Sequence, residues 1–447
     1  MEYRVAIIGG GVLGTSIAYF LSGNAKDPGS IALIEQQSTV ASHTSGRNTG
    51  KVHAPFLYDP EKKKLFAKAA SMGFDMWEKF AAAKNLVFKR DGVMEVATNE
   101  RDVDRLQKYM AWGERNGLTK EDLKFLDKSA AKIAEPNVKC EAAILCTKDG
   151  SVDYNAFTQA LLHDALSFGC TVLLDSRVRG ISYSNGLHRI KTRDREISAR
   201  FIVNAAGGNA IDIAHAMGVA LDYTDLHFRG EYWQAPAQYN DLTKLSIYSV
   251  PKHPEYPFLD PHWIVRADGR REVGPNAVPV FGPYAYSMGK NLADMIPKIF
   301  ESAGTGAQKA FFDRQFLSLA GSEIKSSLSK TAMINRVRAF LPAIRPSAFT
   351  KRGTAGIRSS VIDRSGKFVP DTLVREGESS LHVINYNSPG ATGALPVAAK
   401  ISASLASRGV VDAGRETMTM WDPADIAAEM GDDEDDDDDN NNDNNNF

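Results

Sequence analysis

The sequence predicts a mixed α/β fold, in which a discontinuous domain of βαβ type is interleaved with a second domain of mainly antiparallel sheet plus helices. Two observations predict it. Residues 4–35 have the pattern strand, glycine turn, helix and strand, and segments of that style return at 170–208 and 351–394. Between them, residues 222–285 are rich in aromatics, prolines and short β-like runs. We therefore expect a first domain made of residues 1–83, 150–218 and 346–410, and a second made of residues 84–149 and 219–345.

The other elements are predicted from apolar spacing and turn residues. Pro60 should open a long amphipathic helix, because apolar residues from Leu65 to Phe80 recur at helical spacing. Further helices are expected at 101–116, 154–168, 210–217, within 290–342 and at 396–405. Strands are expected at 92–97, twice within 170–181, at 188–193 and at 200–203, with strand-and-glycine segments at 351–358 and 382–394.

The first βαβ unit has the pattern of a dinucleotide site. Gly9 allows a tight turn, Gly11 lets the backbone approach a pyrophosphate, and Gly14 lets the helix pack close to its strand. Glu35 ends the second strand, where its carboxylate can accept hydrogen bonds from ribose hydroxyls. A βαβ unit without ligand is the alternative. The uncharged residues 5–25 also have the length of a membrane span, but three consecutive glycines argue against one.

The composition is that of an ordinary globular protein, with 43% hydrophobic and 24% charged residues among 447. Three cysteines, Cys140, Cys146 and Cys170, form no CxxC pair and are odd in number. They indicate a reducing compartment and neither a disulfide framework nor a metal site. The first strand begins a few residues after Met1, so we expect neither a signal nor a transit peptide, and a cytoplasmic location.

Charge is distributed unevenly. The net charge is −2, but the segment 431–447 holds nine acidic residues and no basic one. The rest of the chain has 46 acidic and 53 basic residues, an excess of about seven positive charges. Such a body favours anionic substrates or peripheral contact with an anionic membrane, and no basic cluster with interleaved aromatics suggests nucleic acid. We expect residues 411–430 to form an extension and the Asp/Asn tail, 431–447, to be disordered.

A second glycine-punctuated loop, at 41–50, follows Glu35. Its small residues and Arg47 suit a turn around a phosphate and a flavin or nicotinamide ring; the alternative is an ordinary surface loop. The strand–glycine–helix segment at 382–405 would return the chain to the same cofactor. Contacts from both ends of the chain favour a long, buried cofactor, as FAD is.

Together these features resemble the FAD-dependent D-amino-acid oxidase superfamily, and within it most closely the L-2-hydroxyglutarate dehydrogenase and oxidase family. The similar segments span residues 4 to about 405: GRNTGKVH at 46–53, HFRGEYW at 227–233, IYSVP at 247–251, PFL at 257–259, GPNAV at 274–278, AGIR at 355–358 and NSPGAT at 387–392. The chain departs from that family at 54–58, where APFLY replaces the usual SGIYY in a segment that faces the flavin. Ser359 and Ser360 also replace the usual Ala and Gln. We therefore expect a reshaped pocket.

The resemblance implies FAD as cofactor, bound non-covalently because the C-terminal flavin segment contains no cysteine. Besides the first glycine turn and Glu35, it implies cofactor contacts from two further loops and from short segments between them. These contacts are Thr44, Ser45, Arg47, Asn48, Val178, Ala206, Gly207, Gly356, Ser388, Pro389, Gly390, Ala391 and Thr392.

Oxidation of a 2-hydroxy acid requires a base for the hydroxyl proton, groups that bind the carboxylate and a hydride acceptor. His53 is the candidate base, because imidazole accepts a proton near neutral pH. Arg229 is the candidate carboxylate clamp, and its alternative is an ion pair with Glu231. Arg358 should lie near the flavin ring or the substrate. Tyr248 is a candidate catalytic donor, and candidate substrate contacts are His262, Asn276 and Tyr58, each of which could instead be a structural residue.

The sequence therefore predicts an FAD enzyme that transfers a hydride from a short 2-hydroxy acid, L-2-hydroxyglutarate in particular, to flavin N5. One alternative keeps the flavin and acts on an amine or amino acid. Another is a flavin-bound interaction protein without turnover. The electron acceptor could be oxygen, a quinone or a protein. The resemblance also allows a mitochondrial location, because relatives in eukaryotes are mitochondrial.

Overall fold

Strand β1 (Glu2–Ile8) lies inside the first sheet because residues 5–8 are apolar and buried. In the computed structural model, which describes residues 2–252, 260–286, 291, 308–309, 313–387, 389–414 and 416–431, β1 pairs in parallel with β2 and β12. The sheet order is β10-β11-β12-β1-β2-β9, with β22 beside β12 and β21 beside β22. The other strands are β2 (Ile31–Ile34), β9 (Thr171–Leu173), β10 (Gly180–Ser184), β11 (Leu187–Lys191), β12 (Glu196–Asn204), β21 (Leu373–Gly377) and β22 (Ser380–Asn385).

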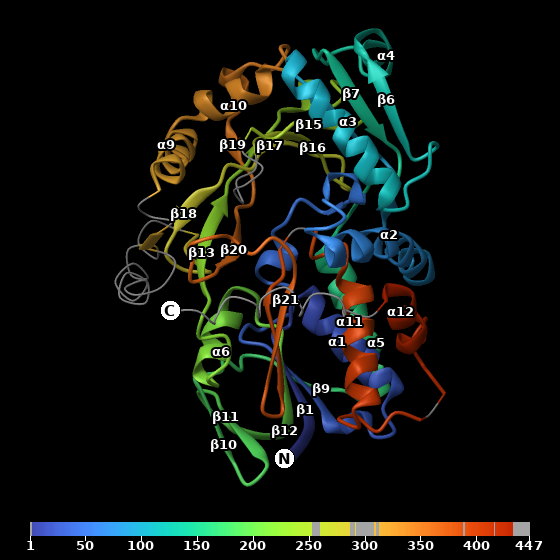
Figure 1. Ribbon diagram of the computed structural model, residues 1–447, viewed down its shortest axis with the longest axis vertical. Helices are drawn as coiled ribbons and strands as arrows, with labels where there is room; N and C mark the ends of the chain where they lie inside the picture. The colour runs from blue at the N-terminus through green and yellow to red at the C-terminus, as the bar shows by residue number, and fades with distance from the viewer. Residues whose placement is uncertain are drawn as a thin grey trace, which may run out of the picture.

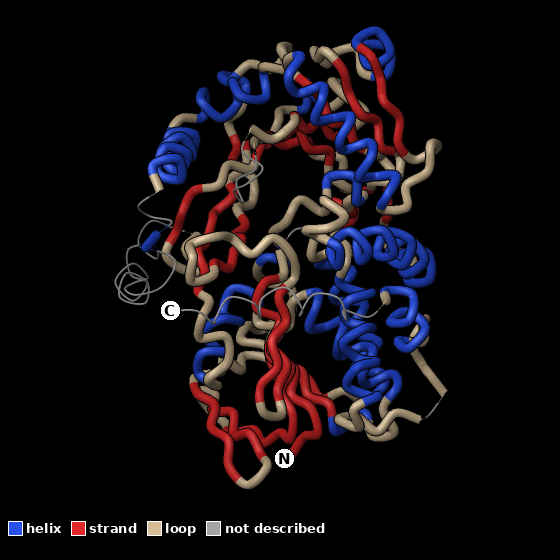
Figure 2. Tube along the Cα trace, viewed as in Figure 1, coloured by secondary structure: helices blue, strands red, loops and turns tan. Residues whose placement is uncertain are grey.

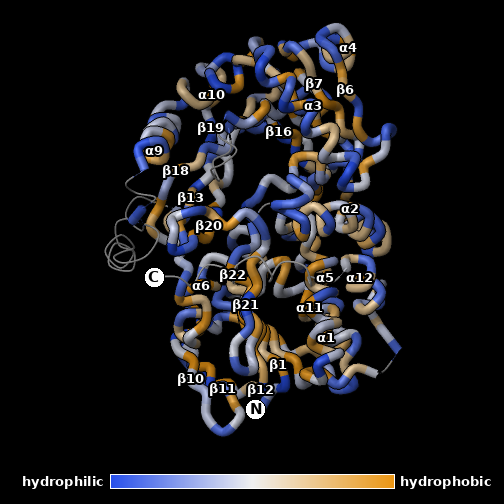
Figure 3. Tube along the Cα trace, viewed as in Figure 1, coloured by the Kyte–Doolittle hydropathy of each residue, from blue (hydrophilic) through white to orange (hydrophobic). Residues whose placement is uncertain are grey.

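Helices cover this first sheet (Figures 1 and 2). Helix α1 (Val12–Asn24) contacts α5 (Tyr154–Phe168) and α11 (Ala394–Ser407), so segments from both ends of the chain share one core. Helix α11 also contacts α2 (Lys64–Lys84) and α12 (Pro423–Met430), while α6 (Ala210–Ala216) lies beside β22. Apolar residues concentrate along β1 and β12 (Figure 3), as expected of parallel strands with both faces covered.

The second sheet has the order β19-β14-β17-β16-β15-β5-β7-β6 and is antiparallel except where β15 runs parallel to β5. Its strands are β5 (Val93–Ala97), β6 (Leu123–Asp127), β7 (Ala142–Cys146), β14 (Trp233–Gln234), β15 (Ser246–Ser249), β16 (His262–Val265), β17 (Arg271–Gly274) and β19 (Lys351–Arg352). Helices α3 (Glu100–Arg115) and α10 (Lys330–Arg338) pack against it, and α4 (Lys128–Ala134) lies at its β6–β7 edge, while α9 (Arg314–Leu328) contacts α10 and β18 (Figure 1).

The described strands also form two three-stranded sheets. One has the order β18-β13-β20, formed by β13 (Thr224–Gly230), β18 (Val278–Val280) and β20 (Gly356–Ile362). The other has the order β3-β8-β4, formed by β3 (Lys51–Val52), β4 (Phe88–Lys89) and β8 (Gly150–Val152). Residues 351–362 therefore pair with strands of the 219–345 segment, although the sequence assigned them to the first domain.

The predicted fold class is confirmed. Helix α5 has the predicted bounds, but α2 begins at Lys64 instead of Pro60, because Lys63 has non-helical backbone angles of φ −133° and ψ 41°. Part of the 290–342 region and the tail from residue 432 lie outside the described residues. All three cysteines are buried and free. Among the residues that the structure describes, no helix combines the length and apolarity needed to cross a membrane.

Candidate functional site

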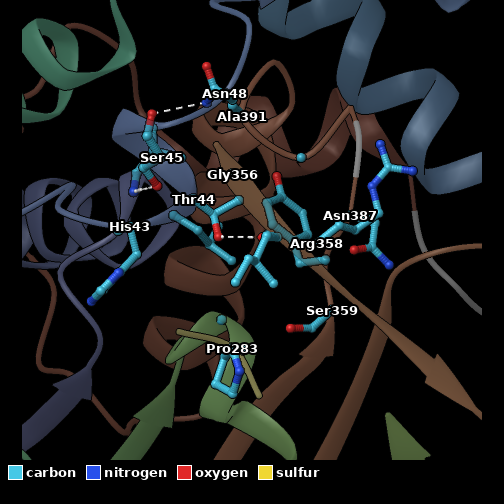
Figure 4. Close-up of a pocket in the computed structure, with 18 of the residues that line it drawn as sticks. His43, Thr44, Ser45, Asn48, Pro283, Gly356, Arg358, Ser359, Asn387 and Ala391 are labelled. Carbon is cyan, nitrogen blue, oxygen red and sulfur yellow. Dashed lines mark hydrogen bonds between the residues drawn. The ribbon is translucent and has the colours of Figure 1, made fainter. Parts of the chain in front are cut away.

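A cavity of about 1100 Å³ extends from the carboxyl ends of β1 and β2 to a face of the second sheet. Glu35 and Val178 line one end, and Tyr248 and His262 line the other. Figure 4 shows part of its wall, where residues from the 43–48 loop, β20 and the 387–391 segment converge. The volume exceeds the range of about 300–1,000 Å³ usual for small-molecule sites, which suits a dinucleotide plus a substrate.

The first glycine turn has no room for side chains. Gly9 has φ +115°, and a Cβ there would lie 2.4 Å from the carbonyl oxygen of Ala205. A Cβ on Gly14 would lie 2.0 Å from the carbonyl oxygen of Gly9, so helix α1 packs directly on the turn. Gly9 and Gly11 line the cavity at the N-terminus of α1, as the dinucleotide motif requires.

Glu35 lies beside this turn. Its Oε2 accepts a 2.7 Å hydrogen bond from the Gly10 N–H, and its Oε1 accepts one of 2.8 Å from the Gln37 N–H. Burial raises the pKa of Glu35, although these backbone hydrogen bonds oppose the change. Each carboxylate oxygen has a second lone pair, so the side chain can still accept from ribose hydroxyls.

The second loop is fixed by neighbouring backbone. Ser45 Oγ accepts a 2.9 Å hydrogen bond from the Val12 N–H, and Thr44 Oγ1 donates to the Ile357 carbonyl at 3.1 Å. Arg47 lies over the Tyr286 ring at 4.4 Å. A Cβ on Gly356 would lie 2.8 Å from the Arg47 carbonyl oxygen, so β20 approaches the loop closely. The loop is therefore a built wall of the cavity rather than an ordinary surface loop.

The third segment, 389–392, is anchored from α2. Trp77 Nε1 donates to the carbonyl oxygens of Ala391 and Thr392 at 3.0 and 2.9 Å. Thr392 Oγ1 accepts from the His53 N–H at 3.0 Å, which fixes His53 beside this segment. Ala206, Gly207 and all the described residues of 389–392 line the cavity. Ser388 lies outside the described residues. The glycine cradle and these three converging segments fit a dinucleotide such as FAD.

His53 faces the cavity with its imidazole backed by a buried ion network. Its Nδ1 lies 3.5 Å from Asp149 Oδ2, and Lys51 Nζ lies 3.1 Å from Asp149 Oδ1 and 3.0 Å from Asp91 Oδ1. Burial alone would raise the pKa of Asp149, but Lys51 and His53 hold it below its usual range. An ionised Asp149 favours the proton on Nδ1 and leaves Nε2 as a proton acceptor.

Asp149 was not predicted from the sequence as a partner of His53. Nothing local signals this contact, because residue 149 meets His53 through the pairing of β3 with β8. Lys51, which has no side-chain exposure, was likewise missed.

The opposite wall contains Tyr248, a predicted catalytic donor, and His262, a predicted substrate contact. The Tyr248 and His262 rings lie with centroids 4.2 Å apart, and the Tyr248 and His53 centroids are 6.3 Å apart. Burial raises the pKa of Tyr248 well above its usual value and lowers that of His262 to about 3. Tyr248 is therefore a protonated donor and His262 a neutral ring near pH 7. Glu95, which the sequence reasoning also missed, lines this wall.

Cationic side chains line the part of the cavity between these walls. Arg358 comes from β20, and burial lowers its pKa against the opposing effect of Tyr232 and Tyr58. Burial lowers the pKa of Lys63, and the nearby Arg358 charge lowers it further. Further cationic residues on this lining are Lys62, Arg105 and Lys108. Tyr58 lines it too, so the altered 54–58 segment does contribute to the pocket.

Arg229 requires a correction. It is not among the described residues that line the cavity, although β13 brings it near. Its Nη2 lies 3.0 Å from Glu231 Oε1, and its Nη1 donates to the Ala285 carbonyl at 3.0 Å. The structure thus places it in the alternative ion pair. Asn276 does line the cavity, but its Oδ1 accepts from the Glu231 N–H at 2.8 Å.

The departure at Ser359 has a structural partner. Ser359 Oγ lies 2.7 Å from His227 Nδ1, and His227 Nε2 lies 3.6 Å from Asp225 Oδ1. This polar chain begins at the cavity wall near Pro283 (Figure 4) and runs into the small sheet. It accounts for a serine at this position as the hydrogen-bond partner of the buried His227.

Comparison with known proteins agrees with this geometry. Residues 4–405 match a family described as FAD dependent oxidoreductase (DAO). An L-2-hydroxyglutarate dehydrogenase of Indibacter alkaliphilus is 30% identical over 400 residues, covering 89% of this chain and 97% of that protein. The mitochondrial L-2-hydroxyglutarate dehydrogenase of Homo sapiens is 27% identical over 432 residues, covering 91% of this chain and 89% of that protein.

Solved structures share the fold. The FAD-bound L-α-glycerophosphate oxidase of Mycoplasma pneumoniae has a TM-score of 0.71 at 20% identity, covering 95% of this chain and 98% of that one. Glycine oxidase from Geobacillus kaustophilus has a TM-score of 0.66 at 18% identity, with the same two coverages.

Proposed function

Because the chain belongs to the DAO family of FAD-dependent oxidoreductases, we propose that it oxidises L-2-hydroxyglutarate to 2-oxoglutarate. Its relatives named for this substrate match along nearly their whole length. The cation-lined cavity suits an anionic substrate. The residues of the first glycine turn, Thr44, Ser45, Arg47 and Asn48, and the described part of 389–392 would hold the cofactor.

The protein must first accept the proton of the substrate hydroxyl. His53 Nε2 accepts this proton, while Asp149 holds the Nδ1–H and stabilises the imidazolium that forms. Lys51 keeps Asp149 ionised. Bound FAD supplies the hydride acceptor at its N5.

The protein must also bind the substrate carboxylate that is next to the reacting carbon. Arg358 is the candidate for binding it, because a guanidinium can offer two parallel N–H groups to a carboxylate. Tyr248, which stays protonated, can donate a hydrogen bond to the substrate from the opposite wall. Substrate would thus be oriented between β20 and β15, with its hydroxyl toward His53.

The observation that carries the proposal is the buried Lys51–Asp149–His53 chain, which ends at a cavity built by three cofactor segments. The test is steady-state oxidation of a panel of L-2-hydroxy acids, their D-isomers and amino acids with an artificial electron acceptor. We expect 2-oxoglutarate to form from L-2-hydroxyglutarate with the highest kcat/KM of the panel. Turnover restricted to amines or amino acids would contradict the proposal.

The physiological electron acceptor stays a prediction among oxygen, a quinone and a protein. Peripheral membrane contact and a cytoplasmic location also stay predictions, and the first of them rests on the cationic body of the chain. Named relatives include both bacterial and mitochondrial proteins.

A further inference from the structure

Glu95 lines the cavity but takes no part in the chemistry above. It lies in β5, beside β15, with Tyr248 at the same register. Ile247 pairs with Trp263, which places Tyr248 opposite His262 on the next strand. Side chains at one register of neighbouring strands point to the same face. Glu95, Tyr248 and His262 therefore form a polar row across about 10 Å of the sheet face, two interstrand spacings wide.

This row has unused hydrogen-bonding capacity. Glu95 is only 1% exposed, and neither of its carboxyl oxygens has a hydrogen-bond partner among the residues that the structure describes. The Nδ1 of His262 is equally buried and without a described partner. Leaving such groups unpaired costs free energy, so an unpaired carboxyl on a cavity wall indicates a polar ligand.

The surroundings of Glu95 decide what that ligand is. Burial raises the pKa of Glu95 to about 8, and the nearby carboxylates Asp260 and Asp102 add to the effect. From α3, Arg105 and Tyr109 also line the cavity, and both Glu95 and Arg105 act on the Tyr109 hydroxyl electrostatically. The partner of Glu95 on β7 is the apolar Ile144.

A neutral Glu95 is a hydrogen-bond donor near pH 7. Arg105, which lines the same cavity and acts on the same Tyr109 hydroxyl, is a cation that attracts anions and repels an ammonium group. We propose that Glu95, with Arg105 and Tyr109, forms a subsite for the carboxylate of the substrate that is farther from the reacting carbon. The subsite rests on the proposed function, since it makes the enzyme selective for 2-hydroxy dicarboxylic acids over monocarboxylic ones.

The test measures binding of two unreactive acids, glutarate and butyrate, to the FAD-loaded full chain by calorimetry. Wild type should bind glutarate more tightly than butyrate at pH 6.5 and lose much of that preference at pH 9.5, where Glu95 ionises. Glu95→Gln keeps a donor that does not titrate, so its preference should be the same at both pH values. Glu95→Leu should lower the preference about 10- to 100-fold at pH 6.5, the value of a hydrogen bond to a charged group.

Glu141→Gln is the matched control, because Glu141 is an exposed carboxylate that pairs with Lys128 at the edge of the same sheet. It should behave as wild type. An undiminished glutarate preference in Glu95→Leu, or a preference in wild type that does not change with pH, would overturn the subsite. If Glu95→Leu fails to fold, the comparison of wild type with Glu95→Gln across pH decides alone.

This test is separable from that of the proposed function. Glutarate preference without oxidation of L-2-hydroxyglutarate would contradict the function and leave the subsite standing. If the protein oxidises L-2-hydroxyglutarate but its preference for glutarate does not depend on Glu95, the proposed function stands and the subsite is contradicted.

Discussion

The role proposed for His53 depends on the residues around it in the structure rather than on its own position in the sequence. The imidazole faces the cavity, Asp149 lies behind it, and Lys51 neutralises Asp149 in turn. Removing one partner of such a buried pair costs about 3–5 kcal/mol, because the remaining charge loses its compensation. We therefore expect substitutions at His53 and at Asp149 to differ in their effect on stability, although both slow the reaction.

His53→Ala should retain bound FAD and slow flavin reduction by about 10²- to 10⁴-fold, the usual contribution of a general base. Asp149→Asn should slow reduction as well and should also lower the melting temperature, because Lys51 would lose a partner. Rapid-mixing absorbance and thermal unfolding measure the two effects. Parental reduction rates in His53→Ala would remove the base from the mechanism.

The raised pKa of the buried Glu95 carboxyl should also make the stability of the protein depend on pH. Its folded-state pKa of about 8 exceeds the ordinary glutamate value of 4.5, so between these values the native state retains a proton that the unfolded state has lost. The stability that the folded protein gains by keeping Glu95 protonated is complete below about pH 4.5. It is lost progressively as the pH rises to about 8. Chemical unfolding should therefore show Glu95→Gln gaining stability relative to wild type across that window. A constant difference would mean that Glu95 is ionised throughout.

At the scale of elements, the sequence was most informative where a feature is local. The strand–turn–helix of residues 2–24 follows from apolar spacing and glycines, and α5 follows from its capping Asp153 and its period. The predicted start of α2 at Pro60 was wrong. A proline is tolerated in the first turn of a helix, but a helix does not have to begin at it. For Arg229 the sequence left open a carboxylate clamp and an ion pair with Glu231, because an arginine between aromatics suits both, and the structure has the ion pair.

Two glycines inside helices provide a matched test of the first turn. A Cβ on Gly14 would meet the Gly9 carbonyl oxygen at 2.0 Å, whereas one on Gly321 in α9 meets nothing within 4 Å. Gly14→Ala should therefore weaken FAD binding and lower stability. Gly321→Ala should leave FAD binding unchanged and stabilise the protein by about 0.5–1 kcal/mol, through helix propensity. Equal effects of the two substitutions would show that close packing at Gly14 is unimportant.

At the scale of the molecule, the cavity is assembled from segments hundreds of residues apart. The cofactor half was predictable, because each of its loops has a local glycine signature. Tyr248 and His262 were predicted as single residues, but the place of Glu95 beside them was not, since it depends on the register between β5 and β15, which are about 150 residues apart in the chain. Cross-strand register over such a separation is set by the packing of the whole sheet.

FAD should stabilise the whole fold, because its site joins both ends of the chain. Thermal unfolding of protein stripped of FAD should give a lower melting temperature, which rises with added FAD. At a free concentration 100 times the Kd, binding adds about 2.7 kcal/mol. A melting temperature independent of FAD would contradict a site that includes both Gly9 and Thr392.

The most direct measurement is anaerobic mixing of the oxidised, FAD-loaded protein with L-2-hydroxyglutarate while flavin absorbance is followed. We expect complete bleaching by about one equivalent of the L-acid, formation of 2-oxoglutarate, and much slower bleaching in His53→Ala. An unchanged flavin spectrum with L-2-hydroxyglutarate, or bleaching by amino acids alone, would contradict the proposed function.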